Sequence, residues 1–243
     1  MQNLQAPGFL RIFSRPKVLI GFFAAALLFL ALFPGVINRR AEKAVVREWL
    51  TPLDTGRRED WDTILVSKKG KYLSPRAAYA HLEEHLHTGI DLQNRHGGGP
   101  GEPVYAVAQG KVFDVKIQGA GTRVSIAHLL PDGEMIYSSY IHMAGIRVKK
   151  GQRVDSSTVL GRRLNRQELA KYGSYYNHLH FQIHRGKFNA ADTIQSKKEN
   201  AVRKKFYDPF EFLKGFPERK NLSWRDWLKE GRISFWELLW IIF

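Results

Sequence analysis

The stretch His178-Leu179-His180-Phe181-Gln182-Ile183-His184 alternates between polar and apolar residues. Because successive side chains of a β-strand point to opposite faces, a period of two predicts a strand here. His178 and His180 then share one face, and Leu179 and Phe181 share the other. One imidazole of the histidine pair can bind a metal ion while its neighbour faces a substrate.

Two other stretches carry residues of the same chemistry, His87-Thr88-Gly89-Ile90-Asp91 and Tyr140-Ile141-His142. A catalytic zinc ion takes three nitrogen or oxygen ligands from the protein and leaves the fourth tetrahedral position to water. Two histidines and one carboxylate satisfy that count. In a straight strand, His87 and Asp91 would lie about 13 Å apart, too far to share one ion. The chain must therefore bend, and Gly89 is the residue that allows the bend.

A rival zinc motif lies just upstream. His81-Leu82-Glu83-Glu84-His85 matches the inverted signature His-x-x-Glu-His, and the preceding residues Pro75 to Ala80 predict a helix. Gly89 would end any such helix one turn later, and the further acidic ligand that these enzymes need has no candidate. A surface helix without metal is the alternative for this segment. His85 and His87 also form a second His-x-His pair, so that pattern alone is weak.

Further motifs surround these stretches in a fixed order. They are Gly101-Glu102-Pro103-Val104-Tyr105-Ala106, Gly110-Lys111-Val112, the run from Gly121 to His128, Tyr140-Ile141-His142-Met143, the run from Val148 to Val154, and His178-Leu179-His180-Phe181. With these motifs, the chain from His87 to Ile183 resembles the lysostaphin and LytM type of zinc metallopeptidase. Members of that family cleave peptide bonds in bacterial peptidoglycan.

The resemblance implies a role for each site residue. It makes His87, Asp91 and His180 the zinc ligands, and it makes His142 and His178 an unliganded catalytic pair. Such a pair can take a proton from water and stabilise the oxyanion that forms on the substrate. All five positions are filled, which favours an active enzyme. His128 matches a histidine outside the active set and is interpreted as structural.

Two features depart from the family pattern. Residues 162–177 are longer, more basic and more aromatic than the Gly-rich stretch that usually precedes the His-x-His strand. This region borders the substrate groove in the family. The identity of the cleaved bond is therefore not inferred from the resemblance, and a protein of reduced activity is an alternative. Gln182 stands where the family often has Glu, a change that leaves the metal set intact.

The predicted fold is mostly β. From 87 to 184, short alternating runs are separated by Gly, Pro-Asp-Gly and Lys-Gly turns, which predicts an antiparallel sheet. The turn from Leu130 to Glu134 predicts a hairpin that places the strand ending in His142 beside Arg123–Leu129. Together with short helical extensions, the metallopeptidase domain is expected to cover residues 75–216, with its core ending near 208–213.

The N-terminal region predicts a membrane anchor. Val18 to Ile37 form an uncharged apolar run of twenty residues, long enough to cross a bilayer as a helix. No small-x-small cleavage site closes the run, which indicates an uncleaved signal anchor. Residues 1–17 are then a cytoplasmic tail, and residues 38–74 are a stalk packed loosely on the domain.

The orientation of this anchor does not follow from charge, because Lys and Arg flank both of its ends. The expected substrate instead places the catalytic domain outside. We therefore expect a single-pass protein of the bacterial cytoplasmic (inner) membrane, with its domain facing the periplasm or the cell wall.

The tail 217–243 is rich in tryptophan, with Trp224, Trp227, Trp236 and Trp240. The apolar residues 233–243 would span only about 16 Å as a helix, too short to cross a membrane. Tryptophan with nearby cations suits a segment lying in the membrane interface. The alternative is that these aromatic side chains pack on the domain.

The chain carries a formal net charge of +15 and has a pI near 10.0. This charge favours an acidic polymer or an anionic membrane surface as partner. The basic residues are scattered and no nucleic-acid module is recognisable, so nucleic acid is not an expected partner. The absence of cysteine is compatible with an oxidising compartment.

Taken together, these features predict a membrane-anchored, zinc-dependent endopeptidase that hydrolyses peptide bonds in peptidoglycan. The alternative is a catalytically silent wall-binding or amidase-activating protein of the same fold.

Overall fold

The structure is a computed structural model, and it describes residues 32, 34–78, 83–95, 98–186, 196–216 and 219–243. The chain divides into two units, residues 1–43 with Ile242 and residues 44–241 with Phe243. The predicted anchor lies almost entirely outside the described residues, and α3 (Pro34–Ala44) covers its last residues and the start of the predicted stalk. Within the described ranges, no helix has the length and apolar character needed to cross a membrane.

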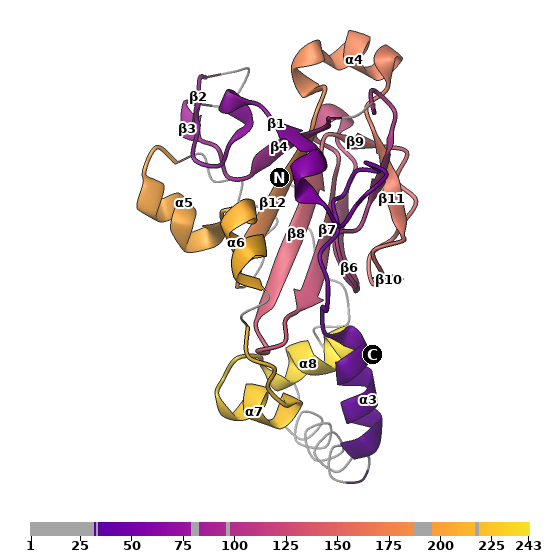
Figure 1. Cartoon of the computed structure of the whole chain (residues 1–243), viewed down its shortest axis with the longest axis vertical. Helices are drawn as coiled ribbons and strands as arrows, with labels where there is room; N and C mark the ends of the chain where they lie inside the picture. Colours follow the sequence, from indigo (N-terminus) through magenta and orange to yellow (C-terminus); the bar gives the residue numbers. More distant parts are fainter. Residues whose placement is uncertain (1–31, 33, 79–82, 96–97, 187–195, 217–218) are drawn as a thin grey trace, which may run out of the picture. The chain divides into compact units, whose positions relative to one another are not determined.

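The second unit is built on an antiparallel sheet (Figure 1). Its strands lie in the order β1-β4-β12-β8-β7-β6-β10, with β13 paired to β12; a smaller sheet has the order β5-β11-β9, and β2 pairs with β3. The predicted mostly β, antiparallel fold is therefore confirmed. The strands are β1 (Ile64–Val66), β2 (Pro75–Arg76), β3 (His85–Leu86), β4 (Ile90–Asn94), β5 (Pro103–Tyr105), β6 (Gly110–Lys116), β7 (Arg123–Leu129), β8 (Met135–Ile141), β9 (Met143–Ala144), β10 (Arg153–Val154), β11 (Val159–Arg163), β12 (Leu179–Arg185) and β13 (Phe206–Tyr207).

Short helices flank the sheets. They are α4 (Arg166–Tyr172), α5 (Glu199–Lys205), α6 (Pro209–Gly215), α7 (Trp224–Lys229) and α8 (Phe235–Ile242), with single 3-10 turns η1 (Trp61–Thr63), η2 (Lys68–Gly70), η3 (Gly119–Gly121) and η4 (Ser174–Tyr176).

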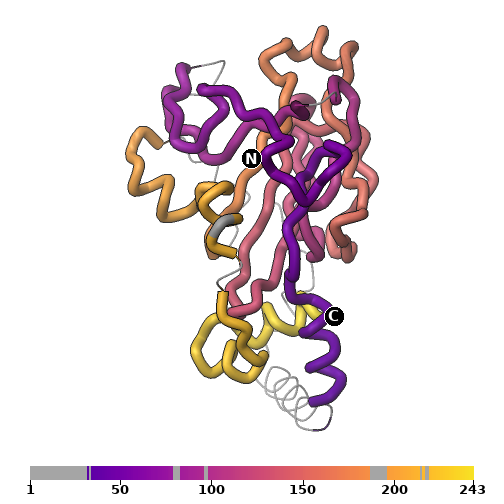
Figure 2. The backbone as a smooth tube through the Cα atoms, viewed as in Figure 1, coloured from indigo at the N-terminus to yellow at the C-terminus, as the bar shows by residue number. Residues whose placement is uncertain are grey.

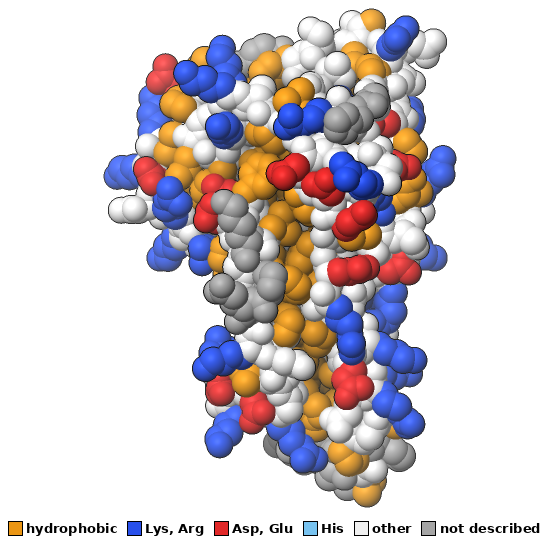
Figure 3. All heavy atoms as spheres, viewed as in Figure 1, with side chains coloured by type: hydrophobic (Ala, Val, Ile, Leu, Met, Phe, Trp, Pro, Cys, Tyr) orange, Lys and Arg blue, Asp and Glu red, His pale blue; other side chains and the backbone are white. Residues whose placement is uncertain are grey.

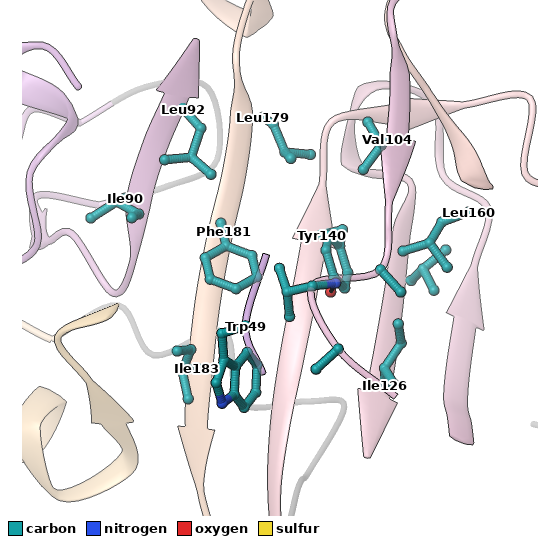
Figure 4. Packing of buried hydrophobic residues seen from close by; sticks show 14 of the residues in the cluster. Trp49, Ile90, Leu92, Val104, Ile126, Tyr140, Leu160, Leu179, Phe181 and Ile183 are labelled. Atoms are coloured by element: carbon teal, nitrogen blue, oxygen red, sulfur yellow. Dashed lines mark hydrogen bonds between the residues drawn. The ribbon is translucent and has the colours of Figure 1, made fainter. Parts of the chain in front are cut away.

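Strand β12 forms where the alternating pattern predicts it. Its apolar residues Leu179, Phe181 and Ile183 are fully buried and pack with Tyr140 in the core (Figure 4). The ring centroids of Tyr140 and Phe181 lie 5.4 Å apart. Because β12 lies between β4 and β8, it brings three distant motifs side by side.

The predicted hairpin between 123 and 142 is also confirmed. Strands β7 and β8 pair in one continuous register from Arg123 opposite Ile141 to Leu129 opposite Met135. In the turn, Gly133 has a φ of +82°, which L-residues with a side chain rarely adopt. A Cβ at this position would also lie 2.3 Å from Cγ of Trp227, so both backbone and packing require glycine.

The prediction of a loosely packed stalk at 38–74 is wrong for residues 44–74. Val46 and Leu53 are completely buried, and Trp49 is 8% exposed. Strand β1 extends the central sheet by pairing with β4, and the chain from residue 44 onward runs along the sheet (Figure 2). The residues of this segment that belong to the core are Val46, Trp49, Leu53, Ile64 and Tyr72.

The C-terminal tail packs on the domain through two of its tryptophans. Trp227 is 2% exposed, and its indole Nε1 donates a hydrogen bond to the carbonyl of Pro131 (3.2 Å). The ring of Trp240 meets the ring of Phe113 edge-on, with centroids 5.8 Å apart. The packing alternative therefore holds for these two residues. Trp236 is 46% exposed, and contact of the tail with a membrane stays a prediction.

His128 has the structural role that its position in the sequence indicated. Its side chain is fully buried, its Nδ1 lies 2.8 Å from the carbonyl oxygen of Gln109, and its Nε2 lies 2.7 Å from Oγ of Ser138. Burial lowers the pKa of His128 to about 4. The imidazole is therefore neutral at pH 7 and serves the core.

Candidate metal centre

The bend predicted at Gly89 is present and brings His87 to Asp91. Strand β4 begins only at Ile90, so His87 lies before the strand. A Cβ at Gly89 would lie 2.2 Å from the carbonyl oxygen of Phe181, so the chain passes against β12 at a distance that only glycine permits. As a result, Nε2 of His87 lies 3.1 Å from Oδ1 of Asp91.

Pairing of β12 with β4 supplies the third residue. His180 stands opposite Asp91 in the register of these strands. Its Nδ1 lies 3.0 Å from Oδ1 of Asp91 and 2.8 Å from Nε2 of His87. In a tetrahedral zinc site with bonds of about 2.1 Å, ligand atoms lie about 3.4 Å apart. The three atoms therefore need to separate by only a few tenths of an ångström to hold one ion.

The donor chemistry of this group also fits a metal cation. Nδ1 of His87 lies 2.9 Å from the backbone carbonyl of Lys71, so it carries the proton and the lone pair on Nε2 faces the other two ligands. Burial lowers the pKa of His180 to about 4, so this imidazole is neutral at pH 7 and able to bind metal.

Asp91 supplies the negative charge of the site. Its side chain is 9% exposed. Burial alone would raise the pKa of Asp91, but the nearby imidazoles of His178, His180 and His87 outweigh that effect and hold the pKa below its ordinary value. The carboxylate is therefore ionised at neutral pH, as a metal ligand must be.

His142 lies at the end of β8 in a strained backbone conformation. Its φ is +66°, which is uncommon for a residue with a side chain and recurs at functional sites. Its Nδ1 lies 2.7 Å from the carbonyl oxygen of Ala120, so Nε2 is left without the proton. Burial lowers the pKa of His142 to about 3, and the nearby His178 and His180 add to that effect. The His142 imidazole is therefore neutral at pH 7.

His178 lies immediately before β12, between the metal group and His142. Its Nε2 is 3.3 Å from Oδ1 of Asp91, and its ring meets the His142 ring edge-on at 4.9 Å. The five predicted residues therefore form one cluster. His178 approaches Asp91 almost as closely as His87 and His180 do. Its assignment as a catalytic residue rather than a metal ligand therefore rests on the family resemblance and not on distance.

The unusual stretch 162–177 folds as α4 and η4 beside the two catalytic candidates. Asn165 caps α4 in a reciprocal capping box with Glu168, which explains why this basic segment is helical. The ring of Tyr176 lies 4.9 Å from that of His142. Tyr175, 50% exposed, lies 6.1 Å from His178. An aromatic wall thus borders the site.

A buried ion pair supports this wall and was not found from sequence. Arg163, 3% exposed, donates to Oε1 of Glu102 (2.5 Å) and to Oδ1 of Asn177 (2.7 Å). Because Asn177 directly precedes His178, the pair fixes the chain at the start of β12. Glu102 belongs to a motif quoted above, but the sequence gave no signal that links it to Arg163.

The inverted zinc signature does not form a site among the described residues. The predicted helix is wrong at its start, because Pro75–Arg76 is strand β2 and pairs with β3, where Arg76 stands opposite His85; residues 79–82 lie outside the described part. Nδ1 of His85 lies 2.7 Å from the carbonyl oxygen of Glu83, and His85 is not in the metal group.

The antiparallel sheet thus carries two histidines and an aspartate around one point, with two more histidines beside them. Residues 85–193 match the family described as Peptidase family M23. Over these residues the chain is similar to peptidase family M23, in agreement with the lysostaphin and LytM family indicated by the motifs. Comparison with curated proteins gave no match.

Solved structures with a similar chain course include two peptidases. The antimicrobial peptidase lysostaphin from Staphylococcus simulans is 20% identical over 74% of this chain and 59% of its own, with a TM-score of 0.45. A zinc-containing peptidase from Vibrio cholerae is 24% identical over 57% and 37%, with a TM-score of 0.39. This chain thus spans less than two thirds of either relative. A chain of the SpoIIIAH and SpoIIQ complex is also similar. It is 22% identical over 69% of this chain and 99% of its own, with a TM-score of 0.42.

Proposed function

We propose that this protein is a zinc-dependent endopeptidase that hydrolyses peptide bonds in bacterial peptidoglycan. The observation that carries the proposal is the convergence of His87, Asp91 and His180 on one point, with His142 and His178 beside them. These residues come from three motifs that are far apart in the sequence, and chance burial of polar groups would not collect five of them.

The chain's own residues have distinct tasks in this proposal. A zinc ion held by His87, Asp91 and His180 would supply Lewis acidity toward the scissile carbonyl and toward water. His142, kept neutral by burial, accepts a proton. His142 then passes this proton to the leaving amine, while His178, whose ring stands at right angles to that of His142, donates a hydrogen bond to the developing oxyanion.

The alternative is a catalytically silent protein of the same fold that binds the cell wall or activates an amidase. The observation that favours it is the aromatic wall, since the rings of Tyr175 and Tyr176 stand directly against the two catalytic candidates. Such a wall can restrict the approach of an extended peptide while leaving the metal group complete.

Digestion of purified peptidoglycan distinguishes these two functions. We expect the full-length chain in detergent to release soluble fragments whose new ends are a free amine and a free carboxylate, identified by mass spectrometry. A chelator should abolish the release, and added zinc should restore it. Release of no fragments across a range of wall types, with the zinc still bound, would favour the silent protein.

We place the domain on the outer side of the cytoplasmic membrane, held by the apolar run 18–37. The high positive charge supports a location near anionic lipid and wall polymers. On the face seen in Figure 3, Lys and Arg side chains are spread among acidic ones, which suits diffuse attraction to such polymers better than tight binding of nucleic acid.

Protease treatment of spheroplasts tests this placement. We expect externally added protease to cut the domain in intact spheroplasts, while a cytoplasmic control protein survives. Protection of the domain until the membrane is permeabilised would reverse the orientation.

A further inference from the structure

The segment Lys71–Arg76 lies upstream of the region that matches the peptidase family, yet it lines the metal group. The carbonyl of Lys71 faces Nδ1 of His87 at 2.9 Å. The backbone of the segment also pairs with the backbone of His87. The N–H of Leu73 donates to the carbonyl of His87 (2.9 Å), and the N–H of His87 donates to the carbonyl of Ser74 (3.0 Å). The segment is therefore held rigidly beside one metal ligand.

The same segment delivers a cation to a second ligand. Nη2 of Arg76 donates a hydrogen bond to Oδ2 of Asp91, and the two side chains are only 11% and 9% exposed. The other oxygen of the carboxylate, Oδ1, is the one that faces His87 and His180. Nε of Arg76 is buried and has no hydrogen-bond partner within the described part of the chain. Asp91 is thus shared between the metal position and a buried guanidinium.

The group behind Asp91 has the opposite charge to the group that usually stands behind a histidine ligand. A carboxylate or carbonyl behind a histidine ligand pushes electron density toward the ion and tightens binding. A guanidinium behind the ligand withdraws that density and repels the ion, and its charge is poorly screened because the pair is buried. Without a metal ion, however, the same guanidinium supplies a cation to a buried carboxylate whose other close partners are the imidazoles of His87, His178 and His180.

We infer that Arg76 is a built-in counter-cation that stabilises the metal-free site and weakens its hold on the metal ion, so that occupancy follows the metal supply. This inference rests on the proposed metallopeptidase function. It assigns to Arg76 an effect on metal affinity and on the stability of the empty protein, both measurable without any substrate.

Three variants of the full-length chain test this inference. Arg76→Gln removes the charge but keeps a hydrogen-bond donor, Arg76→Lys keeps the charge, and Arg57→Gln removes an arginine from the exposed pair with Asp60. Zinc affinity is measured by competition with a chromophoric chelator, and the thermal midpoint is measured with and without zinc.

We expect Arg76→Gln to bind zinc about tenfold or more tightly than the unmodified chain, because one nearby cation is gone. Its thermal midpoint should fall in chelator and recover when zinc is added. Arg76→Lys and Arg57→Gln should stay close to the unmodified chain in zinc affinity.

Equal or weaker zinc binding by Arg76→Gln would overturn the inference, since Arg76 would then act only by orienting Asp91. Zinc binding by the unmodified chain with no gain in the variant overturns the inference and leaves the proposed function standing. If Arg76→Gln binds zinc and the unmodified chain does not, the inference is supported and the proposed function is contradicted. Absence of binding in every variant overturns both.

Discussion

His180→Ala and Asp91→Ala will each leave the purified chain without bound zinc. Both side chains contribute an atom to a group in which the three ligand atoms lie 2.8 to 3.1 Å apart. Loss of one of three protein ligands leaves an inadequate site. Metal content measured by atomic emission after dialysis should be about one zinc per chain for the unmodified protein and near zero for both variants.

His85→Ala is the matched control for this experiment. His85 is two residues from His87 and belongs to the rival inverted signature, but its Nδ1 lies 2.7 Å from the carbonyl oxygen of Glu83 and it is not in the metal group. We expect His85→Ala to keep its zinc. If His85→Ala emptied the site while His180→Ala kept the metal, the inverted signature would be the true zinc motif and the ligand set argued above would be wrong.

His142→Ala and His178→Ala will keep zinc but lose hydrolysis of cross-linked peptidoglycan by roughly 10²-fold or more. Each imidazole is beside the metal group without being one of its three members, and proton transfer or oxyanion stabilisation by a positioned side chain is worth about that much. Fragment release per unit time, measured at equal zinc content, gives the comparison.

Backbone strain at His142 calls for a second variant. Because its φ is +66°, alanine there is disfavoured for a reason unrelated to catalysis, whereas asparagine tolerates this conformation. His142→Asn should match the unmodified chain in thermal midpoint and still lose activity. Digestion close to that of the unmodified chain by His142→Asn and His178→Ala would remove both residues from the catalytic machinery.

The core of the site was predictable because its signals are local. Alternation over 178–184 fixed the strand and the shared face of two histidines, and Gly89 marked the bend that joins His87 to Asp91. Each of these signals depends only on residues that are close together in the chain. The period of a strand and the glycine at a bend can therefore be recognised from the sequence alone.

The surroundings of the site were not predictable because they depend on contacts between distant segments. Arg76 was predicted to lie in a helix at the start of the domain. It instead lies in strand β2, and its side chain donates a hydrogen bond to Asp91. Arg163 and Glu102 are separated by sixty-one positions, and no local pattern links them. The packing of Val46 and Leu53 was missed for the same reason, since their backbones meet Leu129 and Val104, far along the chain.

The central position of β12 ties chemical competence to the completion of the fold. His178 and His180 enter with the last long strand of the sheet, which inserts between β4 and β8. A ribosome or a translocation channel that has released the chain only as far as residue 177 has therefore released none of this strand's histidines. The proposed peptidase therefore lacks two of its five site residues until most of the chain has been released.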